Sequence, residues 1–146
     1  MKFDGTFDVN APREKVWGLI SIPDNMVKCI PDLKEFEILG EDKFKASIKA
    51  GVGFIRGTLN FTFTLSDKTP QSHAKLSGHG TGTGSTVDLE TIIDLSELPE
   101  GGTRMIWKAE AKIGGLIASV GQRLIEGVAQ KTVTNLFDAL KEELEN

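Results

Sequence analysis

The chain has 146 residues, 17 of them basic and 21 acidic, which gives a formal net charge of -4. Its apolar fraction of 39% and charged fraction of 26% are those of an ordinary globular protein rather than of a disordered or membrane-embedded chain. A chain of this length can bury a substantial core, so we expect one domain over residues 1–146. The acidic balance and the absence of a lysine and arginine cluster disfavour a nucleic-acid-binding function.

The first 31 residues predict a strand followed by two short helices. Apolar and polar side chains alternate over residues 2–9, which indicates a strand with one buried face. Asn10 is suited to cap a helix that contains Pro12 in its first turn. A second short helix should begin near Pro23 and end before Pro31, because proline restricts the residue that precedes it.

Six further alternating runs follow between residues 36 and 113, and turn-forming segments such as 40–42 and 98–102 separate them. The clearest run covers residues 55–65, where every second side chain is polar. The chain therefore predicts seven strands.

From about residue 115 to residue 145 the apolar residues recur at steps of three to five, without a proline. This spacing predicts one helix of roughly 30 residues, about 45 Å long. A seven-stranded antiparallel sheet with one solvated face has to cover its other face, and this helix is the main element available. We expect an α+β fold in which a curved sheet wraps around the C-terminal helix.

This element order and four segments of the chain resemble the CoxG family, named for the G subunit of carbon monoxide dehydrogenase, within the START/SRPBCC superfamily, whose fold is called helix-grip. The segments are residues 11–17, 29–31, 49–57 and 121–129. The sequence departs from the family at Asp32, where many members have glycine, and we expect no membrane-anchored C-terminal extension of the kind that some members carry. The resemblance implies an accessory protein of molybdenum hydroxylases of the CO dehydrogenase type, acting through a bound lipid or quinone.

Catalytic and metal-binding patterns are absent from the sequence. The inward-facing strand positions are almost all apolar, so no nucleophile and base, and no pair of carboxylates, are expected to converge. His73 and His79 share the polar face of their strand, and with one cysteine in the chain no zinc-ligand spacing exists. The glycine-rich stretch 78–85 fits no phosphate-binding motif and more simply allows strand curvature. We therefore expect no enzyme and no metal, with a cyclase-like enzyme as an alternative because the superfamily includes cyclases and aromatases.

Small residues on the inward face leave room for an apolar ligand beneath the helix. They are Gly57, Gly78, Gly80, Ala109 and Ala111. The opposing interpretation is a tightly closed core. If a cavity exists, its expected lining is apolar: Met26, Ile30, Leu59, Phe61, Phe63, Val87, Leu89, Trp107, Leu116, Val120 and Leu124.

Cys29 and Phe54 are expected at the mouth of this cavity. For Cys29 the alternative is a buried small hydrophobe. Phe54 lies out of phase with the buried strand face, at a hairpin tip, where it would either gate the pocket or contact a membrane or partner.

The predicted function is binding or transfer of a lipid-like or quinone-like molecule in support of a CO dehydrogenase-type oxidoreductase, without a covalent cofactor. A protein-interaction adaptor without a ligand is the alternative from another class. We expect a cytoplasmic location, because a lone thiol fits a reducing compartment and residues 1–8 do not resemble a signal peptide. No run of about 18 apolar residues predicts a membrane span, so membrane contact would be peripheral. The ligand, the partner and the oligomeric state stay open.

Overall fold

The computed structural model describes residues 1–145. The chain begins with β1 (Lys2–Val9), α1 (Arg13–Ile20), α2 (Pro23–Met26) and the 3₁₀ turn η1 (Val27–Cys29). Six strands follow: β2 (Leu33–Ile38), β3 (Lys43–Val52), β4 (Ile55–Thr69), β5 (His73–Gly82), β6 (Ser85–Glu97) and β7 (Thr103–Gly115). A second 3₁₀ turn, η2 (Ile117–Val120), then leads into α3 (Gln122–Glu145).

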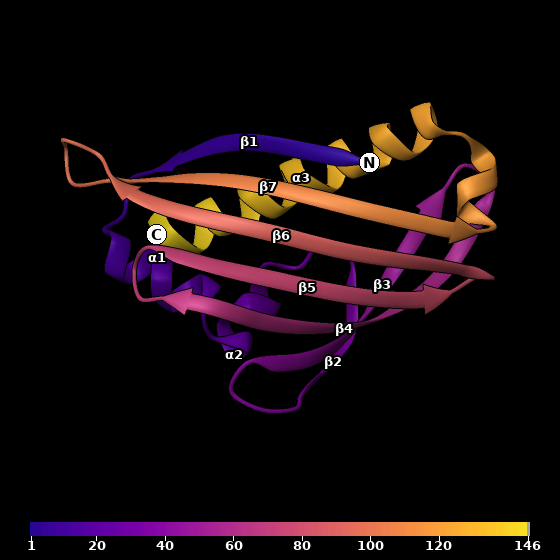
Figure 1. The fold of residues 1–146 in the computed structure, drawn as a ribbon, viewed down its shortest axis with the longest axis horizontal. Helices are drawn as coiled ribbons and strands as arrows, with labels where there is room; N and C mark the ends of the chain where they lie inside the picture. Colours follow the sequence, from indigo (N-terminus) through magenta and orange to yellow (C-terminus); the bar gives the residue numbers. More distant parts are fainter. Residues whose placement is uncertain (146) are drawn as a thin grey trace.

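The seven strands form one antiparallel sheet in the order β1-β7-β6-β5-β4-β3-β2. From β2 to β7 each strand pairs with the next in the chain, and β1 then joins β7, with Lys2 opposite Glu110 and Val9 opposite Thr103. Figure 1 shows α3 running behind the strands, with its C-terminal end beside α1. The predicted helix-grip architecture is confirmed.

The buried side chains gather in two clusters, one at each end of the molecule. The first joins α1, η1 and the C-terminal end of α3 to one end of the sheet, and contains Val9, Ala11, Val16, Leu19, Ile20, Cys29, Ile93, Leu95, Met105, Leu140 and Leu144. The second lies mainly on β3 and β4, and contains Val27, Phe44, Ala46, Val52, Ile55, Leu59, Phe61, Phe63, Ile117 and Ile125. The fully buried apolar side chains are thus concentrated at the two ends of the molecule.

The start of α1 differs from the sequence prediction. Pro12 is the N-cap residue, and no side chain caps the helix. The backbone N–H of Asn10 instead donates to the Glu145 carboxylate at 2.9 Å, so Asn10 ties the chain to the far end of α3. This contact joins residues 135 positions apart, which local sequence rules cannot anticipate.

The C-terminal helix is shorter than predicted because it is interrupted at Gly121. This residue has φ of +102°, a conformation that side chains other than glycine rarely adopt, and it separates η2 from α3. The continuous helix therefore has 24 residues. The interruption changes which residues of the first turns face the sheet.

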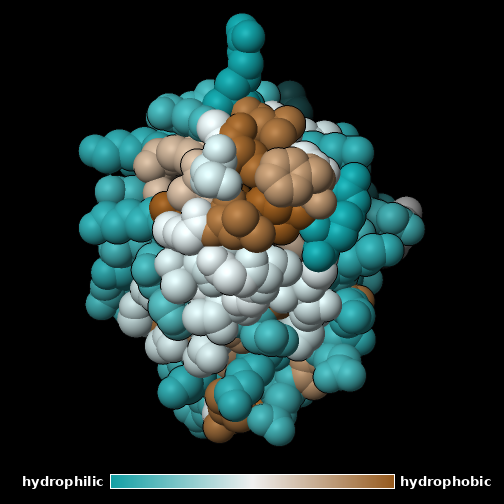
Figure 2. Space-filling view, turned by 90° about the vertical axis from the view of Figure 1, so that its right-hand side faces the viewer, coloured by the Kyte–Doolittle hydropathy of each residue, from teal (hydrophilic) through white to brown (hydrophobic). Residues whose placement is uncertain are grey.

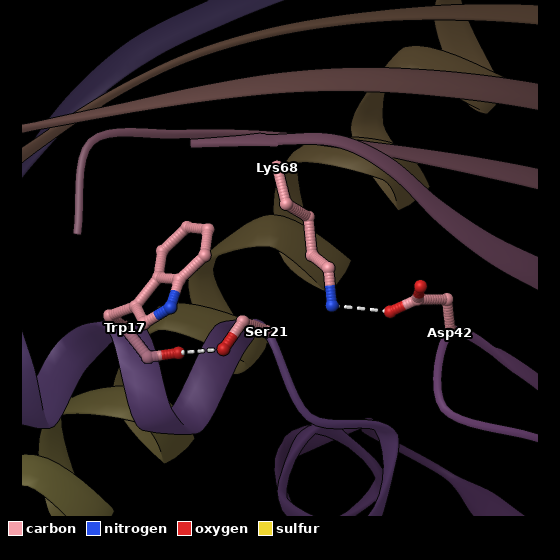
Figure 3. A network of polar contacts seen from close by, with 4 residues as sticks. All are labelled: Trp17, Ser21, Asp42 and Lys68. Carbon is pink, nitrogen blue, oxygen red and sulfur yellow. Dashed lines mark hydrogen bonds and ion pairs between the residues drawn. The ribbon is translucent and has the colours of Figure 1, made fainter. Parts of the chain in front are cut away.

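Two polar contacts organise the strands and helices near α1 (Figure 3). Ser21 Oγ donates to the Trp17 carbonyl at 2.6 Å, at the C-terminal end of α1. Lys68 of β4 donates to the carboxylate of Asp42, in the loop before β3, and Leu65 N–H donates to the Asp42 carbonyl at 2.7 Å. The two bonds to Asp42 hold the β2–β3 turn against β4.

Asp32, the position where the family often has glycine, has φ of +58°. Left-handed backbone costs a side-chain-bearing residue roughly 1–2 kcal/mol, less for Asp than for most. We expect Asp32→Gly to stabilise the protein by about 0.5 kcal/mol, since relief of this strain exceeds the extra entropy glycine adds to the unfolded chain. Urea unfolding measures the change. Asp32→Ala, which keeps a Cβ, should give no such gain, and a loss of stability in Asp32→Gly would contradict the prediction.

Candidate functional site

The inward-facing side chains at the centre of the sheet keep part of their surface accessible. On β5, β6 and β7 the half-buried ones are Leu76, Val87, Leu89, Trp107, Ala109 and Ile113. On β4, by contrast, Phe63 and Leu65 are only 7% and 3% exposed. The backbone of α3 comes closest to β1, β3, η1 and η2 rather than to these central strands. The helix therefore covers the middle of the sheet less completely than its flanks.

The predicted gaps at the inward glycines are filled, which corrects the sequence interpretation. A Cβ at Gly78 would lie 2.6 Å from the Phe63 ring, and one at Gly80 would lie 2.6 Å from the Phe61 ring. The two rings stack on each other with centroids 5.1 Å apart, so they cover the glycines of the neighbouring strand. Thr83 similarly occupies the space over Gly57. Glycine here makes room for aromatic rings and not for a ligand.

Ala111 is likewise buried, at 7% exposure. Ala109, by contrast, is half-buried. The half-buried part of the inner face thus includes Ala109 and its neighbours on β6 and β7.

A second apolar feature is an open hollow of about 600 Å³ at the start of α3. It is lined by Val120, Gly121, Gln122, Arg123, Leu124, Gly127, Val128 and Lys131. Val120 and Val128 also pack against the second cluster. The hollow therefore borders the interior of the protein at the η2–α3 junction.

The predicted lining residues fall into three groups by exposure. Leu59, Phe61 and Phe63 are buried, and the half-buried members are Met26, Ile30, Val87, Leu89, Trp107 and Val120. Leu116 and Leu124 are 47% and 44% exposed, so they lie on the surface and not in the interior lining that the sequence predicts. For Leu124 the reason is the break at Gly121, after which the inward face of α3 starts at Ile125.

Cys29 does not lie at a pocket mouth. It is 2% exposed and belongs to the first cluster, as expected of a small hydrophobe. Burial raises the pKa of its thiol from the usual 9.0 to about 11; the Glu143 carboxylate adds to this effect and Lys28 opposes it. A thiol with this pKa stays protonated at neutral pH and is a poor nucleophile.

The raised pKa of Cys29 predicts a loss of stability in alkali. The unfolded chain releases the thiol proton near pH 9 and the native state near pH 11, so between these values the unfolded state binds fewer protons and stability falls as pH rises. The loss should reach about 2–3 kcal/mol above the native pKa. Urea unfolding of the wild type and of Cys29→Ala should be measured from about pH 8 to about pH 11, and the difference between their losses of stability gives the contribution of the thiol. An equal decline in both proteins would refute this linkage.

Polar groups inside the protein are few. The indole Nε1 of Trp107 is buried and has no hydrogen-bond partner among the described residues. Its ring lies over Gly5, where a Cβ would come within 2.9 Å, and at 5.6 Å from the Phe137 ring of α3. Sequence reasoning identified Trp107 as lining but not this unpaired donor, which depends on three-dimensional surroundings.

The charged side chains of β5 and β6 lie on the outer face of the sheet, where several form cross-strand pairs. His73 Nδ1 lies 2.7 Å from Asp94 and His79 Nδ1 lies 2.5 Å from Asp88, on the exposed face that the sequence predicts. A depression of about 470 Å³ on this face is lined partly by such pairs, with Lys43, Glu90, Glu110 and Lys112 among its residues. Within residues 1–145, no three histidine, cysteine or acidic side chains are placed to hold a metal ion.

Comparison with known proteins identifies the family. The family model of CoxG, the G subunit of carbon monoxide dehydrogenase, matches residues 5–145. The chain belongs to the CoxG family. A conserved protein from Geobacillus kaustophilus, known from its crystal structure, is 30% identical with a TM-score of 0.91, over 99% of this chain and 95% of that one. No curated protein matches the chain in sequence.

More distant solved structures share the fold of this CoxG-family chain. A START superfamily protein from Mycobacterium smegmatis is 13% identical with a TM-score of 0.75, covering 99% of this chain and 97% of that chain. The Zhui aromatase/cyclase from Streptomyces sp. R1128 is 15% identical with a TM-score of 0.70, covering 99% and 94%. Among residues 1–145, no helix combines the length and apolar character needed to cross a bilayer.

Proposed function

We propose that this CoxG-family protein binds a hydrophobic small molecule against the inner face of β5, β6 and β7, beneath α3. The observation that carries the proposal is the partial exposure of apolar side chains on the concave face at the centre of the sheet. Large apolar residues that stay accessible in the interior of a domain favour a guest of matching character, because burial of apolar surface is worth about 25 cal/mol per Å². The same region contains no carboxylate or histidine that would favour a polar guest.

The ligand class we propose is a lipid-like or quinone-like molecule with at least one hydrogen-bond acceptor. The unpaired Trp107 Nε1 supports the acceptor, because a buried donor without a partner costs about 1–3 kcal/mol, which a ligand oxygen would recover if the indole moved away from Gly5 on binding. The remaining proposed contacts are dispersion contacts with half-buried side chains such as Val87 and Leu89. A ring or chain with one or two carbonyl oxygens fits this combination.

The family supports an accessory role for this binding. The CoxG match suggests that the protein serves a molybdenum hydroxylase of the CO dehydrogenase type, delivering or withdrawing its hydrophobic ligand. We place this role in the cytoplasm, where the unpaired Cys29 thiol would stay reduced.

Native mass spectrometry of the purified protein, followed by solvent extraction and mass identification of any guest, tests the proposal. We expect a stoichiometric lipid or quinone, and a rise in melting temperature with members of a lipid and quinone panel. A ligand at about 100 times its Kd adds about 2.7 kcal/mol of stability. Protein that is always empty, and that no panel member stabilises, would overturn ligand binding.

The second candidate function is a protein-interaction adaptor that carries no ligand. The exposed apolar residues at one end of the molecule favour this adaptor function, and Phe54 is the most exposed of them at 80%. Pull-down of the partner oxidoreductase by empty protein, with no effect of added quinone, would support this function over the first.

A further inference from the structure

One end of the molecule carries an apolar patch built from two distant segments. Phe54, at the tip of the β3–β4 hairpin, is 80% exposed, while Leu116 and Leu124, on either side of η2, are 47% and 44% exposed. The hairpin tip touches the start of α3, because a Cβ at Gly53 would lie 2.9 Å from Leu124 Cδ2 and 3.9 Å from Val120. Figure 2 shows the brown patch at this end, with side chains of intermediate hydropathy below it and hydrophilic ones further to either side. We call these three exposed residues the end patch.

The charge around the end patch is opposite to that of the rest of the chain. The two segments that carry the end patch, residues 49–58 and 112–131, contain five basic residues and one acidic residue, and the β5–β6 turn beside them, residues 81–86, contains no charged residue. Since the whole chain has 17 basic and 21 acidic residues, the remainder contains 12 basic and 20 acidic ones. An acidic protein therefore presents a basic rim at its most apolar end.

Several of the basic groups lie close to the patch. Arg56 Nη1 donates to the Gly53 carbonyl at 2.6 Å, which holds a guanidinium at the base of the hairpin tip. Arg123 and Lys131 line the open hollow that also includes Leu124. Basic side chains thus flank Phe54 on one side and Leu124 on the other.

We propose that the end patch docks this protein on a membrane surface that contains anionic lipids. An exposed aromatic and two leucines are suited to insert at the boundary of headgroups and acyl chains, and nearby lysine and arginine side chains are attracted to anionic headgroups. Anionic headgroups would repel the acidic remainder of the surface, so the charge distribution also orients the protein with its end patch toward the membrane. An acidic protein partner would match both the charge and the exposed phenylalanine, and an absence of vesicle binding would favour it.

Docking in this orientation places the start of α3 at the lipid. The open hollow at the η2–α3 junction then faces the headgroups, beside the inserted side chains. This docking surface goes beyond the proposed ligand binding, and it stands on the patch and the charge distribution alone.

Vesicle sedimentation tests the proposal with the intact chain. We expect binding to vesicles of phosphatidylcholine mixed with phosphatidylglycerol, much weaker binding to phosphatidylcholine alone, and weakening by salt. Phe54→Ser should reduce the partition coefficient on the mixed vesicles by about tenfold or more. Arg123→Gln combined with Lys131→Gln should reduce it on mixed vesicles and leave the weak binding to neutral vesicles unchanged.

The chain offers a matched control in Phe36, which is 54% exposed on the edge strand β2, between Glu35 and Glu37. Phe36→Ser should bind vesicles like the wild type. Equal binding of Phe54→Ser and wild type, equal binding to neutral and mixed vesicles, or no vesicle binding at all would overturn the docking proposal. Native mass spectrometry of the wild type without vesicles measures ligand content independently of docking, so the two proposals can fail separately.

Discussion

The Ala109→Phe variant is expected to fold and to bind its hydrophobic ligand roughly 10- to 100-fold more weakly than the wild type. Ala109 lies on the inward face of β7, opposite Phe3 of β1 and Thr91 of β6, and is half-buried. A benzyl group there would extend into the space between the central strands and α3. The ligand could then occupy this space only by displacing the new ring, which weakens binding.

Ligand-induced thermal stabilisation and ligand content by native mass spectrometry measure this effect. Lys108→Phe is the control, because Lys108 is the adjacent residue on the exposed face of the same strand. It should leave ligand binding unchanged. If Ala109→Phe retains full ligand content, the guest lies elsewhere, and the open hollow at the start of α3 is the next place to probe.

The largest effect on stability is expected from Phe44→Ala, at about 3–5 kcal/mol. Phe44 is 1% exposed in the second cluster, and its ring stacks on that of Phe63 with centroids 5.1 Å apart. Truncation removes this contact and leaves a cavity that β3 and β4 cannot close, since Phe63 is itself held against Gly78. Urea unfolding should show the loss as a lower midpoint with an unchanged slope.

Phe36→Ala serves as the comparison for this measurement. Phe36 is on the neighbouring strand but is 54% exposed, so its truncation should cost less than about 1 kcal/mol. A cost for Phe44→Ala as small as that of Phe36→Ala would mean that the second cluster is loosely packed, contrary to its burial.

The strands could be predicted from the sequence because their signal is local. Every second residue of β4 is apolar from Ile55 to Leu65, and the structure buries all of these except Gly57. The long apolar repeat before Leu144 likewise predicted α3. The predicted start of this helix was wrong. The apolar repeat of three to five residues continues across Gly121, but the helical backbone is interrupted there.

The candidate site was less predictable, because its shape depends on which side chains share a space. The absence of a Cβ at Gly78 and Gly80 predicted room for a ligand, but Phe63 and Phe61 of the adjacent strand occupy it. The strand pairing that brings these rings over the glycines is not visible in one sequence. The end patch has the same origin, since Gly53 and Leu124 are 71 positions apart in the chain and meet only in the fold.

The order of the strands also has a consequence for folding kinetics. From β2 to β7 each strand pairs with its successor, so five hairpins can zip one after another with short loop closures. β1 is different, because Lys2 pairs with Glu110, so this pairing must close a loop of more than one hundred residues. Its docking beside β7, with the N-terminal ammonium donating to the Ala111 carbonyl at 2.9 Å, is therefore expected to be the late step of folding.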